Sequence, residues 1–146
     1  MLTLDQAVQI ASSGLQEGKQ RGFAPLCIAV LDTGAHVLAL LRDERAAIGR
    51  PDIAITKASG CLSMGFGGRE LARRAQHSPQ FFFSLASIFP RGILPVPGGV
   101  LIRDAGGAIV GAVGVSGDTS DNDEICALAG IAAAALIADA GTAAVT

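Results

Sequence analysis

The chain has 146 residues, of which 50% are hydrophobic and only 16% are charged. This length suits a single domain with a sizeable hydrophobic core. The net charge of −2, the scattered basic residues and the lack of Trp and Tyr argue against a nucleic-acid partner. Because so few charges cover so small a protein, we expect apolar surface to be hidden between the subunits of a homo-oligomer.

The N-terminal residues carry Asp5 and no cleavable apolar core, so no signal peptide is expected. The longest apolar run, residues 125–138, is too short and too rich in Ala to span a bilayer. Cys27, Cys61 and Cys126 show neither metal-ligand spacing nor a disulfide framework, and we interpret them as small buried hydrophobes. These features predict a cytoplasmic protein with no membrane partner and no metal site.

The first third of the chain predicts a helix followed by a hairpin. Residues 3–22 have apolar residues at helical spacing, and Thr3 with Gln6 forms a capping box at their start. Two short apolar segments, residues 27–31 and 37–41, are separated by a turn that contains glycine. This arrangement is typical of two antiparallel strands.

The middle of the chain predicts a second helix and then an irregular region. Pro51 suits the first turn of a helix that runs to about Met64. After a glycine-rich break, residues 69–77 predict one or two further helical turns. The Phe81–Phe83 run is interpreted as irregular apolar core or subunit interface, and the alternative is a floor for a flat aromatic ligand. Several prolines and glycines up to Gly99 then predict a loop with exposed backbone donors.

The last third predicts a second hairpin and a final helix. Residues 100–103 and 108–116 read as paired strands, and Ser120 with Asp123 predicts the cap of a helix that ends near Ala140. Helix, hairpin, helix, loop, hairpin and helix in this order predict an α+β domain with an antiparallel sheet.

The most informative segment is the glycine-studded run 106–117 with the acidic stretch 118–124 behind it. Carboxylates at a helix N-terminus stabilise the helix, and small residues before it let a backbone or a flat ligand approach closely. The segment therefore predicts one wall of a pocket. Since neighbouring helical residues point about 100° apart, we expect one of Asp123 and Glu124 to face this pocket and the other to face water.

Lys57 is the most informative single charge, because it shares a mostly apolar helix stripe with Ile53 and Cys61. A buried Lys needs an acidic partner or a bound anion. The alternative is a Lys whose stem lies along a subunit interface while its ammonium reaches water. Arg42 and Asp43 end the second predicted strand, where site residues occur but surface ion pairs occur as well.

In order and spacing, these motifs resemble the GlcG/HbpS-like family, which includes the C-terminal domain of PduO-type corrinoid adenosyltransferases. The resemblance is carried by residues 22–39, 41–43, 52–58, 97–100, 109–117 and 123–124. It covers nearly the whole chain and identifies residues 1–146 as a single GlcG/HbpS-like domain. It implies a profilin-like three-layer α/β/α fold with a central antiparallel sheet of about five strands, and a symmetric homo-oligomer from dimer to octamer.

Some members of this family bind heme or assist heme degradation or sensing, while others accompany glycolate, diol or aromatic catabolism as operon accessories. In heme-binding members a His of the first helix is a proposed axial ligand. Residues 3–21 here contain no His, Cys, Met or Tyr. A heme iron would therefore need His36, His77, Met64 or a cysteine at some other site.

The first functional hypothesis is a small-ligand-binding protein, with heme or a related tetrapyrrole as the candidate cofactor. Backbone N–H groups near Gly98 would hold the ligand, and Arg42 or Lys57 would pair with its carboxylates. The predicted ligand-binding residues are Arg42, Asp43, Lys57, Pro97, Gly98, Gly99, Asp123 and Glu124.

The second hypothesis is an isomerase or lyase that acts on a small oxo- or hydroxy-acid. Lys57 would polarise a carboxylate or carbonyl of the substrate, and Glu124 would move a proton. A third reading is an oligomeric accessory protein without chemistry of its own.

Overall fold

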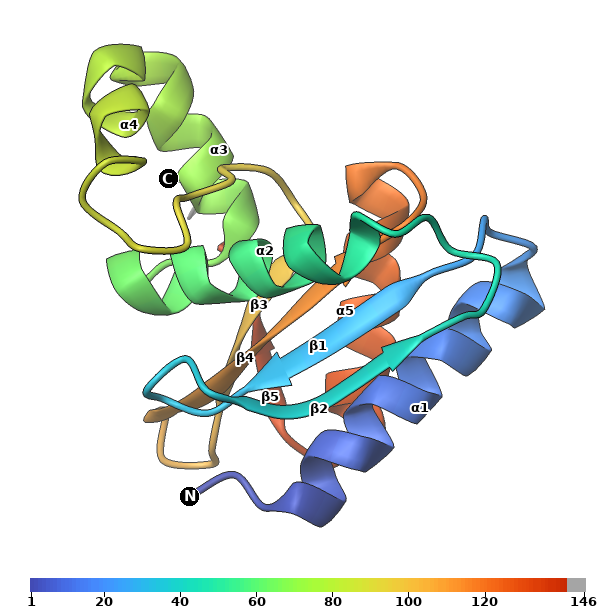
Figure 1. The fold of residues 1–146 in the computed structure, drawn as a ribbon. Helices are drawn as coiled ribbons and strands as arrows, with labels where there is room; N and C mark the ends of the chain where they lie inside the picture. The colour runs from blue at the N-terminus through green and yellow to red at the C-terminus, as the bar shows by residue number, and fades with distance from the viewer. Residues whose placement is uncertain (142–146) are drawn as a thin grey trace.

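The computed structural model describes residues 1–141, which contain five helices and a five-stranded antiparallel sheet in the order β2-β1-β4-β3-β5 (Figure 1). The strands are β1 (Cys27–Leu31), β2 (Val37–Arg42), β3 (Gly99–Arg103), β4 (Ile109–Ser116) and β5 (Ile137–Asp139). The helices are α1 (Leu4–Arg21), α2 (Arg50–Met64), α3 (Gly68–His77), α4 (Pro79–Leu85) and α5 (Ser120–Ala133).

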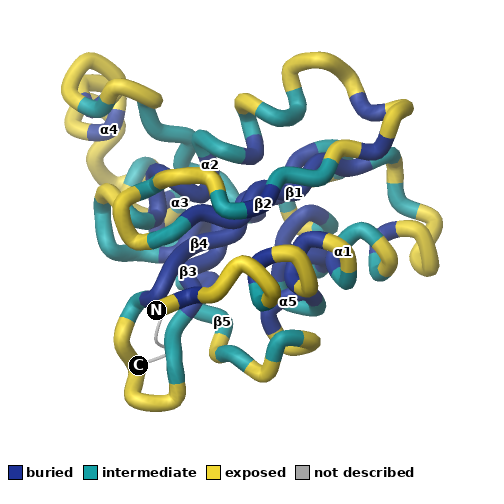
Figure 2. The backbone as a smooth tube through the Cα atoms, turned by 60° about the horizontal axis from the view of Figure 1, so that its bottom comes forward, coloured by how far each residue is buried: buried dark blue, intermediate teal, exposed yellow. Residues whose placement is uncertain are grey.

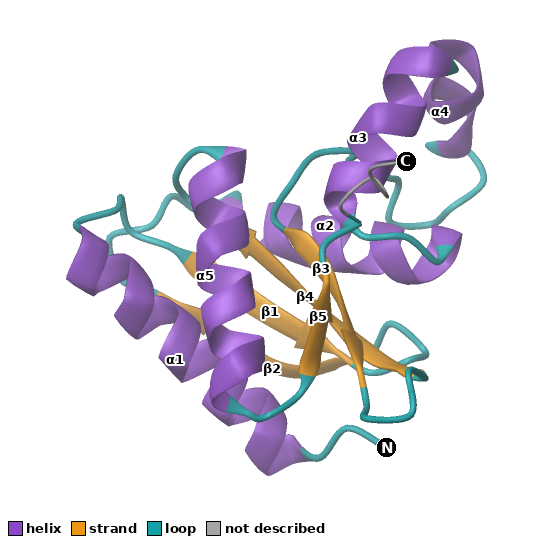
Figure 3. Cartoon of the chain, turned by 180° about the vertical axis from the view of Figure 1, so that it is seen from behind, coloured by secondary structure: helices purple, strands orange, loops and turns teal. Residues whose placement is uncertain are grey.

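Helices cover both faces of the sheet. Helices α1 and α5 pack together on one face and α2 lies across the other, as the opposite views of Figures 1 and 3 show. Successive strand residues point to opposite faces, so Ile28 and Val30 of β1 join the core under α1 and α5, while Ala29 and Leu31 pack on the side of α2. The predicted three-layer α/β/α fold is confirmed.

The start of α1 forms as predicted. The backbone N–H of Gln6 donates to Thr3 Oγ1 at 3.1 Å, and the backbone N–H of Thr3 donates to Gln6 Oε1 at 3.0 Å. These two bonds satisfy amide groups that a helix end leaves without partners. Gly22 ends α1 in the left-handed region, with φ of 72°.

A glycine in β4 sets how closely α2 approaches the sheet. A Cβ atom at Gly114 would lie 1.8 Å from the carbonyl oxygen of Ala54 in α2. Because that contact is with backbone, no side-chain rotation relieves it. A residue without a side chain at this point therefore lets the backbone of α2 rest directly on β4.

The region around the Phe81–Phe83 run differs from its predicted irregular form. It is the short helix α4, whose first turn begins with Pro79, a residue that suits this position. Helices α3 and α4 form an arm that extends beyond the sheet (Figure 1), and the burial map shows α4 as one of the most exposed parts of the chain (Figure 2).

The C-terminal region also differs from the prediction. Helix α5 is capped by Thr119 rather than Ser120, since the N–H of Asn122 donates to Thr119 Oγ1 at 3.2 Å. The helix ends at Ala133 and not near Ala140. Ala135 adopts a left-handed conformation with φ of 58°, which turns the chain so that β5 pairs with β3.

Candidate functional site

Lys57 forms a buried ion pair with Asp123. Its Nζ donates to Asp123 Oδ2 at 2.9 Å and to the carbonyl oxygen of Val115 at 3.0 Å. The two charged side chains are only 4% and 1% exposed. Burial raises the pKa of Asp123, while the ammonium of Lys57 opposes that rise. The acidic partner that a buried Lys requires is therefore supplied by α5, within the same chain.

The second oxygen of Asp123 is also used. Asp123 Oδ1 accepts the backbone N–H of Asp118 at 3.0 Å, which ties the carboxylate to the loop before α5. A carboxylate with two such partners holds the end of β4, the loop and α5 in one arrangement. The hydrogen bonds of the Lys57–Asp123 pair thus give it a structural role, which is to hold these segments together.

Gly98 and Gly99 lie against Lys57 and are buried, which corrects the prediction of a loop with exposed donors. A Cβ atom at Gly98 would lie 2.8 Å from Lys57 Nζ, and one at Gly99 would lie 2.5 Å from the carbonyl oxygen of Lys57. Gly98 has φ of 109°, a conformation that glycine adopts readily. These residues therefore pack the start of β3 onto α2, and Pro97 precedes them half-buried.

Glu124 is held by Arg69, a residue that belongs to no motif in the sequence. Arg69 of α3 donates through Nε to Glu124 Oε2 at 3.1 Å and through Nη2 to Glu124 Oε1 at 3.0 Å. Arg69 Nη2 also reaches Asp121 at 2.7 Å, and these carboxylates raise the pKa of Arg69. Because Asp123 and Glu124 are both buried, the expectation that one of them faces water is wrong.

Arg42 and Asp43 form a separate cluster at the end of the edge strand β2. Arg42 Nη1 donates to the carbonyl oxygens of Asp43, Glu44 and Ala46 at 3.0–3.3 Å. Asp43 accepts Arg45 Nε and Nη2, each at 3.1 Å. Among residues 1–141, no hydrogen bond links this cluster to Lys57. The structure thus brings together Lys57, the two glycines and Asp123, with Glu124 beside them, and leaves Arg42 and Asp43 apart.

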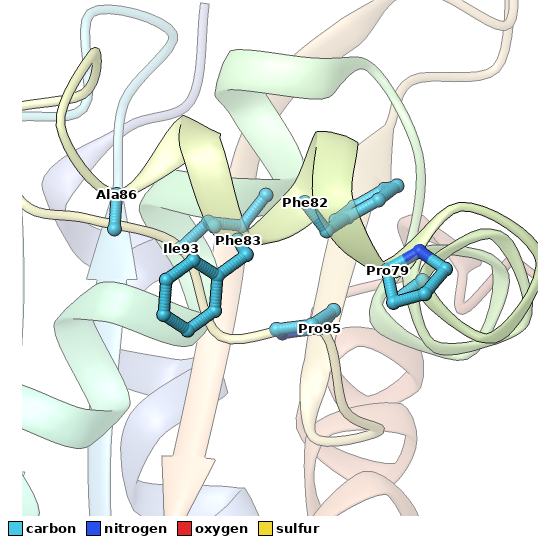
Figure 4. Close-up of a pocket in the computed structure, with 7 residues that line it drawn as sticks. Pro79, Phe82, Phe83, Ala86, Ile93 and Pro95 are labelled. Carbon is cyan, nitrogen blue, oxygen red and sulfur yellow. The ribbon is translucent and has the colours of Figure 1, made fainter.

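The arm carries an open apolar groove of about 390 Å³. Figure 4 shows that its walls come from α4 and from the segment that leads into β3. The lining residues are Ala75, Pro79, Phe82, Phe83, Ala86, Ile93 and Pro95. Phe83 is 88% exposed, so most of its side chain is uncovered within the described chain.

A second groove of about 410 Å³ adjoins the first at Phe82 and is much more polar, and we call it the His77 groove. Its lining residues are Met64, Arg73, Arg74, His77, Ser78, Phe81 and Phe82. The rings of Phe81 and Phe82 meet edge to face, with centroids 5.7 Å apart. This groove thus combines aromatic rings, an imidazole, a thioether and two guanidinium groups.

Glu70 fixes the two arginines of this groove. It accepts Arg73 Nε at 2.8 Å, Arg73 Nη2 at 2.6 Å and Arg74 Nε at 2.8 Å. These bonds lower the pKa of Glu70 from 4.5 to about 2. The guanidinium of Arg74 also lies 3.9 Å from the ring centre of Phe66, which is a cation–π distance.

Acid is expected to destabilise the fold through Glu70 and Asp43. Hydrogen bonds from Arg45 lower the pKa of Asp43 from 3.8 to about 2, and Glu70 has a similar folded value. Both groups release protons more easily when folded, so their stabilising effect is present above the unfolded pKa and disappears as the pH falls from about 4.5 to about 2. Urea unfolding across this range should show the decline, and Glu70→Gln should flatten it. Parallel curves for the two proteins would contradict the assignment to Glu70.

The cysteines and His36, which the sequence offers as further ligands for a heme iron, do not form a binding site. Burial raises the pKa of Cys27 to about 11 and those of Cys61 and Cys126 to about 12, so all three remain buried thiols at neutral pH. His36 is exposed in the β1–β2 turn, where its Nδ1 lies 3.4 Å from Asp32 Oδ1.

Within residues 1–141, no three His, Cys, Asp or Glu side chains gather as a metal cluster. None of the helices there has the length and apolar character needed to cross a membrane.

The layered α+β architecture defines the class of this domain, and comparison with known proteins defines its family. The model of the family described as haem-degrading protein HbpS-like matches residues 2–132. The chain therefore belongs to the HbpS-like family. No curated protein matches it in sequence.

Several solved structures share the fold. The crystal structure of HbpS is 30% identical, with 90% of this chain and 88% of that chain covered and a TM-score of 0.78. The Klebsiella pneumoniae protein ORFY is 26% identical over 91% of this chain and 90% of its own, with a TM-score of 0.80. The PduOC:heme complex is 20% identical over 90% and 94% of the two chains, with a TM-score of 0.80, and supports the fold alone.

The residues of the His77 groove fit a heme. A heme presents a flat apolar ring, an iron that binds imidazole or thioether ligands, and two carboxylates. Phe81, which is exposed, offers surface to the ring, and the mostly buried Phe82 supports it from behind. His77 and Met64 carry ligand atoms, and Arg74 is one of two guanidinium groups for the carboxylates. By contrast, the hydrogen bonds of the buried Lys57–Asp123 pair go to the backbone of Val115 and Asp118, and none of them involves an aromatic, His, Cys or Met side chain.

Proposed function

We propose that this chain is a small-ligand-binding protein whose ligand is heme or a related tetrapyrrole. The observation that carries the proposal is the α3–α4 arm, on which two open grooves meet at Phe82. An apolar wall with a few convergent polar groups is the usual form of a cofactor site. The family description, which names haem degradation, and the heme complex of PduOC add support from relatives.

When bound, heme would supply iron for ligand binding or electron transfer, and the chain's own residues would set its position. The aromatic rings of the arm would exclude water from one face of the ring system. The guanidinium groups held by Glu70 are preorganised to pair with carboxylates. Little of the binding energy is then lost to ordering those side chains.

The isomerase or lyase alternative receives less support from the geometry. Lys57 and Glu124 are each engaged by an internal partner, Asp123 and Arg69. A substrate would have to displace both ion pairs, and Lys57 is almost fully buried. The hypothesis of proton transfer by Glu124 therefore remains a prediction from the sequence, and ligand binding on the arm is the function that the geometry favours.

We also propose that the chain forms a homo-oligomer. Phe83, Ile88 and Ile48 each expose most of their side chains, and such apolar surface is commonly covered by another subunit. The arm would then lie near a subunit contact, which places the proposed ligand site close to the interface.

A heme titration of the purified apo-protein, read by absorbance, tests the binding function. We expect a sharp Soret band that saturates at a fixed ratio of heme to subunit, with the number of subunits measured by light scattering on the same samples. Phe81→Ser should weaken binding, because it removes an exposed aromatic ring of the His77 groove. A broad response that never saturates would overturn the tetrapyrrole proposal, and a monomeric mass would overturn the homo-oligomer.

A further inference from the structure

We propose that the His77 imidazole would bind the iron and that Arg73 and Arg74 would pair with the heme carboxylates in the His77 groove. This inference rests on the proposed function and assigns its site to named residues.

The fold holds His77 at a fixed junction. It is the last residue of α3, and α4 begins two residues later at Pro79. Backbone bonds brace this junction, since the N–H of Ser78 donates to the carbonyl of Arg74 at 2.9 Å and the N–H of Phe82 donates to that of Ser78 at 3.2 Å. The imidazole is therefore presented beside the aromatic pair of α4, with no hydrogen bond to its side chain from residues 1–141.

The other residues that could bind the heme iron are excluded because they are buried or because their surroundings do not suit a heme. The three cysteines are fully buried thiols, and α1 contains no ligand residue. His36 lines a different groove, which has one aromatic residue, Phe89, and one cation, Arg91. That guanidinium already donates to the carbonyl of Ala35 at 2.7 Å. The His77 groove has two aromatic rings, two cations and the thioether of Met64.

The charge of the His77 groove suits a dianionic ligand. Its lining includes two guanidinium groups and no carboxylate, and the two side chains are 47% and 45% exposed. Arg74 uses only Nε to reach Glu70, which directs its two terminal nitrogens elsewhere. Glu70 thus orients the arginines without covering them. A carboxylate of the ligand can then form the bidentate hydrogen bonds that a guanidinium group favours.

The first test compares His77→Ala with the matched control His36→Ala, since both residues are exposed and the chain has no other histidine. We expect the wild-type protein and His36→Ala to give the same Soret band and affinity. His77→Ala should shift the band and bind heme at least tenfold more weakly, and imidazole added to the solution should restore the band. Circular dichroism verifies that both variants are folded.

An unchanged Soret band and affinity in His77→Ala would overturn the assignment of His77 as the iron ligand. This conclusion would hold also if a second copy of the chain covers the groove. That result would leave the proposed function standing, because the wild-type protein would still bind heme. Failure of the wild-type protein to bind would instead remove the proposed function itself.

The second test concerns the carboxylates. Heme should bind about tenfold more tightly than its dimethyl ester, which corresponds to the loss of one charge-assisted hydrogen bond. The double variant Arg73→Gln/Arg74→Gln should abolish this preference, whereas Arg91→Gln in the other groove should retain it. An equal preference in all three proteins would overturn the role given to the two arginines.

Discussion

Replacement of Lys57 with Met is expected to lower the free energy of unfolding by about 3–5 kcal/mol. The substitution removes the ammonium that lies 2.9 Å from Asp123 Oδ2 and leaves a carboxylate buried without its partner. Urea unfolding followed by circular dichroism is the suitable measurement, because the chain contains no Trp to report by fluorescence.

The control is the double variant Lys57→Met/Asp123→Asn. Asparagine keeps an oxygen that can accept the N–H of Asp118 and removes the unpaired charge, so the double variant should recover a large part of the loss. Recovery by a second substitution would show that the single variant suffers from an uncompensated charge. A Lys57→Met protein as stable as the wild type would contradict the structural role of the pair.

Replacement of Gly114 with Ala is expected to destabilise the fold by about 1–3 kcal/mol or more. The new methyl group would lie 1.8 Å from the carbonyl oxygen of Ala54 and 3.0 Å from the backbone nitrogen of Ala58, so α2 would have to move away from β4. The same movement would disturb Lys57, which lies between these residues of α2 in the sequence.

Gly106→Ala is the matched control for Gly114→Ala. Gly106 lies in the turn between β3 and β4, and an added Cβ would meet only Asp104 Oδ1, at an ordinary contact distance of 3.4 Å. Its stability should therefore stay within about 0.5 kcal/mol of the wild type. Equal midpoints for the two variants in urea would contradict the close approach of α2 to the sheet.

The parts of the fold with strong local signals were predictable from the sequence. The capping box at Thr3 and the stop at Gly22 define α1, and glycine-containing turns between apolar segments define both hairpins. Each of these signals acts over a few residues, so no knowledge of the tertiary structure is needed to interpret it.

Other elements lack such signals. Three consecutive phenylalanines have no helical period, so α4 reads as irregular, although Pro79 marks its first turn. The Ala-rich end of α5 contains neither Gly nor Pro between Ala132 and Asp139, and the turn at Ala135 depends on the pairing of β5 with β3. Tertiary contacts override helix propensity here.

The candidate site also combines features that have a local sequence signal with features that depend on tertiary contacts. The stripe around Lys57 predicts a buried charge that needs an acid, but its partner Asp123 lies 66 positions further along the chain, and only the packing of α2 and α5 on opposite sides of β4 brings them together. The Glu70 cluster has a local signal, because acid and base at positions i, i+3 and i+4 share a helix face. His77 and Phe81 could not be joined into one groove without knowledge of α4.

The position of iron in a crystal of the heme-loaded protein shows whether His77 binds the metal. An anomalous difference map at the iron absorption edge locates the metal independently of the density for the ring. We expect a single strong peak within coordination distance of the His77 imidazole, with the ring beside Phe81 and Phe82. A strong peak beside α1, beside His36 or between Lys57 and Glu124 would contradict it.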